Sequence, residues 1–172
     1  DGAEALRPIA YYCKDLGIPY LTVYAFSTEN WKRPMEEVSA IMDLLQNYLL
    51  EALEKMERDG FRVHFFGDLE GLPPKLRDLC LRTLEEGDAL DGTRFQVNVC
   101  LNYGGRDEIL RAAKAWAADV QAGRQTPEAL TDELFSRYLD SRGVPDPDLI
   151  IRPSGELRLS NFLLWQVAYT EF

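Results

Sequence analysis

Strand-like and helix-like segments alternate along the 172 residues of this chain, and this alternation restricts the possible folds more than any other feature. Residues 20–25, 63–66, 95–101 and 149–151 have the β-branched and aromatic composition of buried strands. Apolar residues recur at helical spacing between them. Strands that alternate with helices form parallel sheets. The sequence therefore predicts an α/β fold, with a mostly parallel central sheet flanked by helices in a single domain over residues 1–172.

One expected helix, residues 36–59, is unusual because its apolar positions extend beyond one narrow stripe. Leu44 and Leu50 lie outside the stripe that would pack on a sheet. An ordinary core helix and a helix with a second face lining an apolar tunnel both account for this pattern. Further helices are expected after Pro73-Pro74, over residues 109–120, and after an N-cap at Thr131.

Charge and cysteine content restrict the function. The net charge of −10 argues against a non-specific nucleic-acid binder, which needs a basic surface, although a few arginines in a cleft can still bind a phosphorylated ligand. Three cysteines without CxxC spacing indicate a reducing compartment and no structural zinc. His64, the only histidine, lies in a strand pattern and is expected to pack in the fold.

Neither end of the chain resembles a complete terminus. The sequence starts without Met, shows no signal-peptide pattern, and stops inside an apolar segment at Phe172. No apolar run approaches the roughly 20 residues that span a bilayer. We expect a fragment that is incomplete at both ends.

Polar clusters follow three of the predicted strands, at residues 26–34, 102–106 and 152–161. Ligands of open α/β sheets bind beyond the carboxyl ends of the strands. If the strands are parallel, these clusters share one edge of the sheet. That edge is the expected functional site.

The loop 26–34, FSTENWKRP, combines hydroxyls, a carboxylate, an amide, an indole and an arginine. Such a set can bind a polar head group while the indole faces an apolar tail. A polar loop that caps the next helix is the alternative interpretation.

The segment 152–161 carries Arg152, Arg158, Ser160 and Asn161. Two arginines and a hydroxyl suit the oxygens of a diphosphate. A surface arginine pair joined to Glu156 and Asp148 is equally consistent with the spacing. For residues 102–106, NYGGR, we favour a tight strand-to-helix turn that supports the neighbouring site over an anion site at the helix N-terminus.

Three motifs together resemble the cis-prenyltransferases of the undecaprenyl diphosphate synthase type: FSTENWKRP at 26–34, NYGGR at 102–106 and IRPSGELRLSNFLLWQ at 151–166. The resemblance runs from Gly2 to Phe172. It implies repeated condensation of isopentenyl diphosphate onto an allylic diphosphate, such as farnesyl diphosphate, with Mg²⁺ as cofactor. The implied product is a long-chain polyprenyl diphosphate of the cell-wall lipid-carrier type, and the implied setting is a homodimer in the bacterial cytosol with weak membrane contact.

The resemblance also implies roles for individual residues. The allylic substrate would contact Ser27, Thr28, Glu29, Trp31 and Arg33, and isopentenyl diphosphate would contact Arg152, Arg158, Leu159 and Ser160. Glu171 matches a metal-binding glutamate. Asn30 matches a position assigned as the proton acceptor; because a carboxamide is a very weak base, we expect it to orient a diphosphate oxygen or a water.

The sequence departs from the family pattern in three ways. It stops before the family's C-terminal strand and arginine-glycine tail. The family's Asp-Gly-Asn-Gly-Arg-Trp motif is missing, since Asp1-Gly2 precedes residues that match the helix after it. Pro153 stands where threonine is common. The 172 residues alone are expected to be inactive. A non-catalytic subunit that stabilises a catalytic partner, and an unrelated phosphate-binding α/β domain, are the alternatives; product length is left open.

Overall fold

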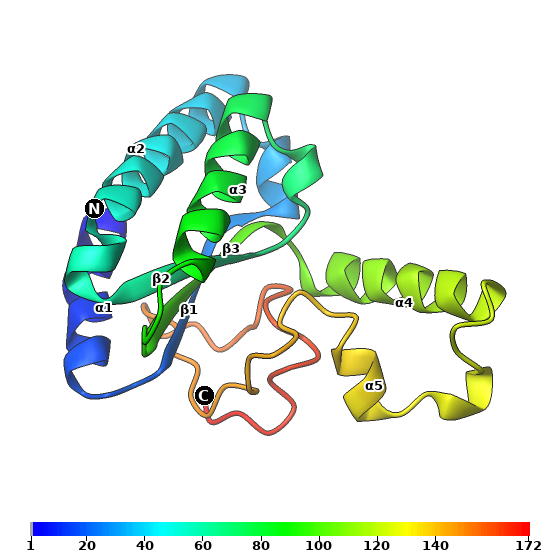
Figure 1. Ribbon diagram of the computed structural model, residues 1–172. Coiled ribbons are helices and arrows are strands. Elements are labelled where there is room, and N and C mark those ends of the chain that lie inside the picture. The colour runs from blue at the N-terminus through cyan, green and yellow to red at the C-terminus, as the bar shows by residue number, and fades with distance from the viewer. Residues whose placement is uncertain (1) are drawn as a thin grey trace. The chain divides into compact units, whose positions relative to one another are not determined.

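The computed structural model describes residues 2–172 (Figure 1). Its main elements are α1 (Gly2–Asp15), β1 (Tyr20–Ser27), α2 (Met35–Asp59), β2 (Phe61–Phe66), α3 (Pro74–Asp88), β3 (Phe95–Tyr103), α4 (Gly105–Gln121) and α5 (Asp132–Ser136). Single 3-10 turns are η1 (Thr28–Lys32), η2 (Leu69–Gly71) and η3 (Pro127–Ala129). Each predicted helix and the first three predicted strands are present.

The sheet has the strand order β1-β3-β2, so β3 is central. β2 and β3 pair in parallel, from Phe61 opposite Phe95 to Phe66 opposite Cys100. Nearly every residue of β3 is buried, as expected for a parallel strand that is covered on both faces. The predicted α/β class with a parallel sheet is confirmed.

The chain divides into two compact units, residues 1–102 and residues 103–172. In the first unit, α2 and α3 lie side by side against the sheet (Figure 1). Gly60, in the left-handed conformation at φ 68°, ends α2. The helices and strands enclose an apolar core formed by Phe26, Val38, Met42, Leu49, Leu72, Leu76, Cys80 and Leu101.

The second unit contains less regular structure. After α4 and α5 its chain continues as turns and bends to Phe172. Its buried set mixes Leu139 and Leu163 with the polar Glu108, Ser141 and Gln166. The single domain expected over residues 1–172 stays a prediction.

The predicted strand 149–151 is wrong. Leu149 makes only an isolated parallel bridge with Glu171, and both Leu149 and Ile151 are exposed, at 60% and 78%. Pro147 and Pro153 flank the segment and have no N–H for a ladder. A single bridge does not make a strand, and the apolar triplet alone does not show whether a neighbouring segment pairs with it along its length.

Several smaller expectations concern single residues. Thr131 caps α5, because its Oγ1 accepts a hydrogen bond from Leu134 N at 3.2 Å. His64 is half-buried, with its Nε2 3.1 Å from Asp88 Oδ1. Cys13, Cys80 and Cys100 are free thiols. Within residues 2–172 no helix is long and apolar enough to cross a membrane.

Candidate functional site

The loop after β1 is built around an aromatic pair. Phe26 is 1% exposed in the core, whereas Trp31 in η1 is 38% exposed. Their ring centroids lie 4.9 Å apart in an edge-to-face arrangement, a favourable geometry for two aromatic rings. The buried ring thereby holds the partly exposed indole at the surface of the first unit.

Asn102 fixes the other side of the indole. Trp31 Nε1 donates to Asn102 Oδ1 at 2.7 Å, and Asn102 Nδ2 donates to the carbonyl of Asp68 at 2.8 Å. The orientation of the amide is unambiguous, because indole N–H can only donate and a carbonyl can only accept. Asn102 has a φ of 49°, in the left-handed region that asparagine tolerates better than most residues. Asn102, near the end of β3, thus supports the loop after β1, which is the role that we favoured for the segment 102–106.

Asn30 presents donors. Its Oδ1 accepts a hydrogen bond from Ser27 N at 2.9 Å, so the carboxamide oxygen is already engaged within the loop. What the side chain can offer a ligand is its NH₂ group. This arrangement suits a group that holds a diphosphate oxygen and does not suit a proton acceptor.

The remaining polar residues of the loop lie near its surface. Thr28 Oγ1 donates to Glu29 Oε2 at 3.2 Å, and Arg33 Nη1 lies 3.6 Å from Glu37 Oε2. Burial, and secondarily the charge of Glu29, raises the pKa of Tyr24 to about 12. The loop therefore carries a carboxylate, Glu29, and a cation, Arg33, which pairs with Glu37 of α2.

In the second unit, Arg152 closes the segment 152–160 on itself. Its Nη1 donates to the carbonyl of Arg158 at 2.5 Å and to Ser160 Oγ at 2.7 Å. Arg158 is exposed and pairs with Glu156, so the surface-pair alternative holds for that arginine alone. Leu159, between Arg158 and Ser160 in the sequence, is half-buried. The structure thus brings Arg152 and Ser160, eight residues apart, into direct contact.

The backbone is strained at four positions between residues 154 and 163. Ser154, Ser160, Asn161 and Leu163 all have positive φ, at 71°, 50°, 64° and 47°. Residues other than glycine adopt this region at a cost of about 1 kcal/mol or more, and such residues concentrate at functional sites. Surrounding contacts must hold these conformations in place.

A buried polar network lies beside the segment and was not predicted. Glu108 is 1% exposed and accepts hydrogen bonds from Tyr103 Oη at 2.6 Å, from Asp140 N at 2.9 Å and from Gln166 Nε2 at 3.2 Å. Burial raises the pKa of the Glu108 carboxyl. A glutamate in the first turn of a helix is typical of a solvated charge at the helix N-terminus, so no local pattern indicates the burial of Glu108.

Glu171 is exposed, and its backbone bonds on both sides to residues 148–150. Among residues 2–172, no three His, Cys, Asp or Glu side chains gather in a metal-binding cluster. Mg²⁺ commonly binds through one or two carboxylates and completes its shell with waters and substrate phosphates. A single accessible carboxylate fits that mode and no closed protein site.

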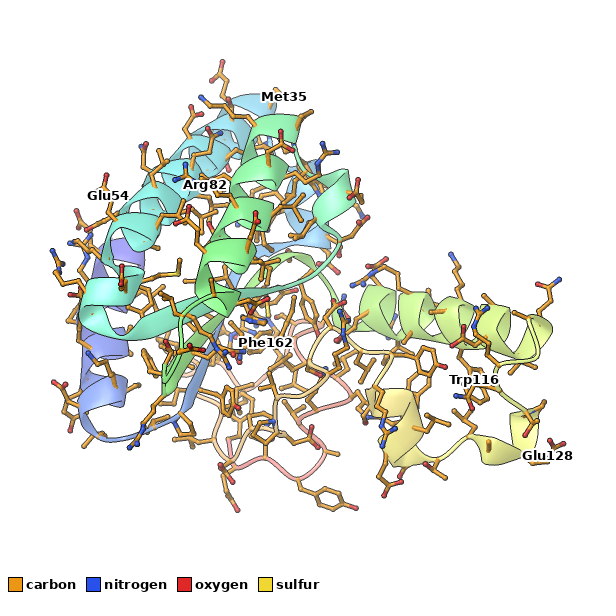
Figure 2. The ribbon with its side chains drawn as sticks, in the orientation of Figure 1. Met35, Glu54, Arg82, Trp116, Glu128 and Phe162 are labelled. Carbon is orange, nitrogen blue, oxygen red and sulfur yellow. The ribbon has the colours of Figure 1, made fainter. Side chains whose placement is uncertain are left out.

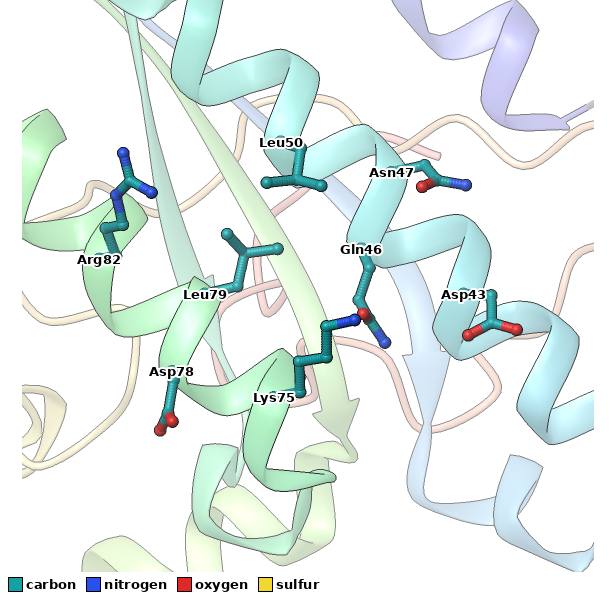
Figure 3. Close-up of a pocket in the computed structure, with 8 residues that line it drawn as sticks. All are labelled: Asp43, Gln46, Asn47, Leu50, Lys75, Asp78, Leu79 and Arg82. Carbon is teal, nitrogen blue, oxygen red and sulfur yellow. The ribbon is translucent and has the colours of Figure 1, made fainter.

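The first unit has an open groove of about 520 Å³ between α2 and α3 (Figure 3). Leu50 and Leu79 point toward one another across it. The other lining residues carry polar or charged side chains: Asp43, Gln46, Asn47, Lys75, Asp78 and Arg82. The apolar tunnel predicted along the helix of residues 36–59 stays a prediction.

Comparison with known proteins agrees with the resemblance. The family model described as putative undecaprenyl diphosphate synthase matches residues 1–172. Isoprenyl transferase of Heliobacterium mobile is 51% identical over 172 residues, covering 99% of this chain and 65% of the relative. The isoprenyl transferase of Clostridium perfringens is 46% identical over 171 residues, covering 99% of this chain and 67% of the relative. The chain spans about two thirds of the length of these curated relatives.

Solved structures give the same result. A probable undecaprenyl diphosphate synthase from Campylobacter jejuni superposes with a TM-score of 0.84 at 38% identity, covering 98% of this chain and 77% of the other. Lavandulyl diphosphate synthase from Lavandula x intermedia, solved in complex with dimethylallyl diphosphate, has a TM-score of 0.86 at 33% identity, covering 92% and 68%. The chain therefore belongs to the putative undecaprenyl diphosphate synthase family of prenyltransferases.

Proposed function

We propose that this chain belongs to a cis-prenyltransferase that adds isopentenyl diphosphate to an allylic diphosphate, with farnesyl diphosphate as the starter. Membership of the family supports prenyl chain elongation. The contact between Arg152 and Ser160 carries the assignment of the isopentenyl diphosphate site, because it assembles a cation and a hydroxyl on one strained turn.

The proposed reaction makes one carbon–carbon bond in each cycle. The C1–O bond of the allylic diphosphate breaks, and the diphosphate leaves with the electron pair. C4 of isopentenyl diphosphate bonds to the allylic C1, and C2 of the same unit loses a proton. The protein must therefore hold two diphosphates, stabilise the departing one and shelter a cationic carbon chain.

Arg152, Arg158 and Ser160 would hold the diphosphate of the isopentenyl unit. Within the segment, Arg152 donates hydrogen bonds through Nη1. The other N–H groups of its planar guanidinium would then bind phosphate oxygens. Arg158 is exposed and shared with Glu156, so a diphosphate would compete for it. Leu159 sets the spacing between the two polar residues.

The allylic substrate would lie among the polar residues of the loop, with Trp31 against its apolar part. These polar residues are Ser27, Thr28, Glu29, Asn30 and Arg33. Asn30 would donate its NH₂ to a diphosphate oxygen, because its Oδ1 is engaged. The proton from C2 then goes to a diphosphate oxygen or a water. A tunnel along one face of α2 would take the growing chain.

Glu171 would be the carboxylate ligand of Mg²⁺ in this proposal. When bound, the ion neutralises charge on the diphosphate. We further propose a homodimer in the cytoplasm, with membrane contact through its lipid product, which is a long-chain polyprenyl diphosphate.

The test is an elongation assay on the protein at its full expressed length, with labelled isopentenyl diphosphate, farnesyl diphosphate and Mg²⁺. We expect incorporation of label into long polyprenyl products, and a large loss in Arg152→Lys, which cannot form the same fork. Arg124→Lys is the matched control, since Arg124 pairs with Asp119 outside the segment. No incorporation by the protein alone, with activity restored only by a second subunit, would favour the non-catalytic alternative.

A further inference from the structure

We propose that Asn161 is the positioning residue of the isopentenyl diphosphate segment, which it anchors to the first turn of α4. The inference rests on the proposed function and deepens it. Asn161 follows Ser160 directly, so its position determines where that hydroxyl and the contacting guanidinium of Arg152 lie.

Asn161 bonds to α4 twice. Its carbonyl oxygen accepts from Gly105 N at 2.7 Å, and its Oδ1 accepts from Arg106 N at 2.9 Å. The first N–H groups of a helix have no partner within the helix. Asn161 supplies acceptors for two of them from a residue more than fifty positions along the chain. The N-terminus of α4 therefore holds the segment, which leaves those amides unable to bind an anion.

The left-handed backbone makes this double contact possible. Ser160 and Asn161 have φ of 50° and 64°, a turn tight enough for one residue to present its carbonyl and side chain to the same helix end. Asparagine is among the few residues that adopt this conformation readily and also carry a short acceptor. Asn161 combines the left-handed backbone with the side-chain acceptor that bonds to Arg106 N.

Neighbouring contacts fix the following residues to the end of β3 and to α4. Phe162 packs edge-to-face on Tyr103, with centroids 6.4 Å apart, and lies among the turns of the second unit in Figure 2. A Cβ on Gly105 would lie 2.7 Å from Leu164 Cγ, so this close approach requires glycine. Gln166 donates to Glu108 one turn further along α4. Of the residues 161, 162, 164 and 166 that make these contacts, Asn161 is thus the nearest in sequence to Arg152 and Ser160.

The experiment uses the protein at its full expressed length with Asn161→Gly, which keeps the backbone carbonyl and tolerates the positive φ but removes Oδ1. We expect faster hydrogen exchange at the Arg106 amide and an affinity for isopentenyl diphosphate weakened about tenfold, the effect of one hydrogen bond on the geometry of the site. The KM for isopentenyl diphosphate should rise more than kcat falls. Asn161→Ala, which also strains the backbone, should show a larger loss.

Thr131→Ala is the matched control, because it removes a similar capping bond at the N-terminus of α5. We expect it to leave the affinity unchanged. Equal affinity in Asn161→Gly and the unaltered protein overturns the proposal, as does unchanged exchange at Arg106. If the unaltered protein does not bind isopentenyl diphosphate, the proposed function fails, and the exchange at Arg106 alone decides whether Asn161 anchors the segment.

Discussion

The two units of the molecule secure their candidate site residues in different ways. In residues 1–102 an apolar core between α2, α3 and the sheet supports a short polar loop. In residues 103–172 a turn-rich segment is tied to α4 by polar contacts, and Glu108 and Gln166 are buried among them. Both units use a left-handed asparagine: Asn102 holds Trp31, and Asn161 holds the first turn of α4.

The difference shows two ways to hold a loop in place: by apolar packing under helices and strands, or by hydrogen bonds within a turn-rich segment. Apolar burial is non-directional, so a core tolerates changes that preserve volume and pattern. Hydrogen bonds are directional, and a buried group that loses its partner carries the full desolvation cost. The first unit should therefore respond to lost volume, and the second to lost partners.

The largest effect is expected in the apolar core of the first unit. Leu76 on α3 is fully buried, and Leu76→Ala should lower the free energy of unfolding by about 2 to 5 kcal/mol through lost burial and a cavity. Urea denaturation measures this change. Leu81→Ala on the same helix, where the side chain is 48% exposed, should cost clearly less. Similar losses for both would contradict the description of this core.

Removal of the central acceptor should destabilise the second unit nearly as much. Glu108→Ala would strip partners from Tyr103 Oη, Asp140 N and Gln166 Nε2, at a cost of about 2 to 4 kcal/mol. Glu108→Gln keeps the shape and an acceptor and should recover most of the loss. Equal destabilisation by the two variants in urea denaturation would show that volume matters here more than partners.

The same residue gives a dependence on pH. Because the pKa of Glu108 is raised above its ordinary 4.5, the folded protein binds the proton more tightly than the unfolded chain does. Its contribution to stability is therefore complete at pH below 4.5 and falls as the pH rises through the folded-state pKa. The difference in stability between Glu108→Gln and the unaltered protein, measured across this range, should change in the direction that favours the variant at higher pH. A constant difference would contradict the assignment.

A smaller effect is expected at the indole of the first unit. Trp31→Phe keeps the contact with Phe26 but removes the bond to Asn102 Oδ1, which should cost about 1 kcal/mol. Trp165→Phe removes a comparable bond to Ser136 Oγ at 3.1 Å in the second unit. Thermal denaturation of the two variants compares one hydrogen bond in each setting. An affinity for farnesyl diphosphate that falls in Trp31→Phe alone would sharpen the distinction.

The smallest effect on stability is expected for Arg33→Ala. Its ion pair with Glu37 is exposed and 3.6 Å long, and such pairs contribute about 0 to 1 kcal/mol. Activity should nevertheless fall if Arg33 contacts the allylic substrate. Unchanged kinetics with farnesyl diphosphate would remove Arg33 from the site.

The sequence predicted regular elements better than contacts. The helix 36–59 is observed as Met35–Asp59, since its proline start and glycine end are local signals. The strand 149–151 was wrong, because pairing depends on a neighbour outside the segment. Asn161 was grouped with the diphosphate residues, but its bond to Arg106 joins positions 55 apart, and no periodicity reports such a contact.

The sequence by itself determined the α/β class and the family, because periodicity and the motifs at 26–34 and 151–166 are local and specific. Only the tertiary structure decided that Asn30 presents donors, that Arg152 meets Ser160, and that Glu108 is buried. The physical reason is the same in each case. A side chain's chemistry depends on which acceptors and donors surround it, and folding brings those groups from distant parts of the chain.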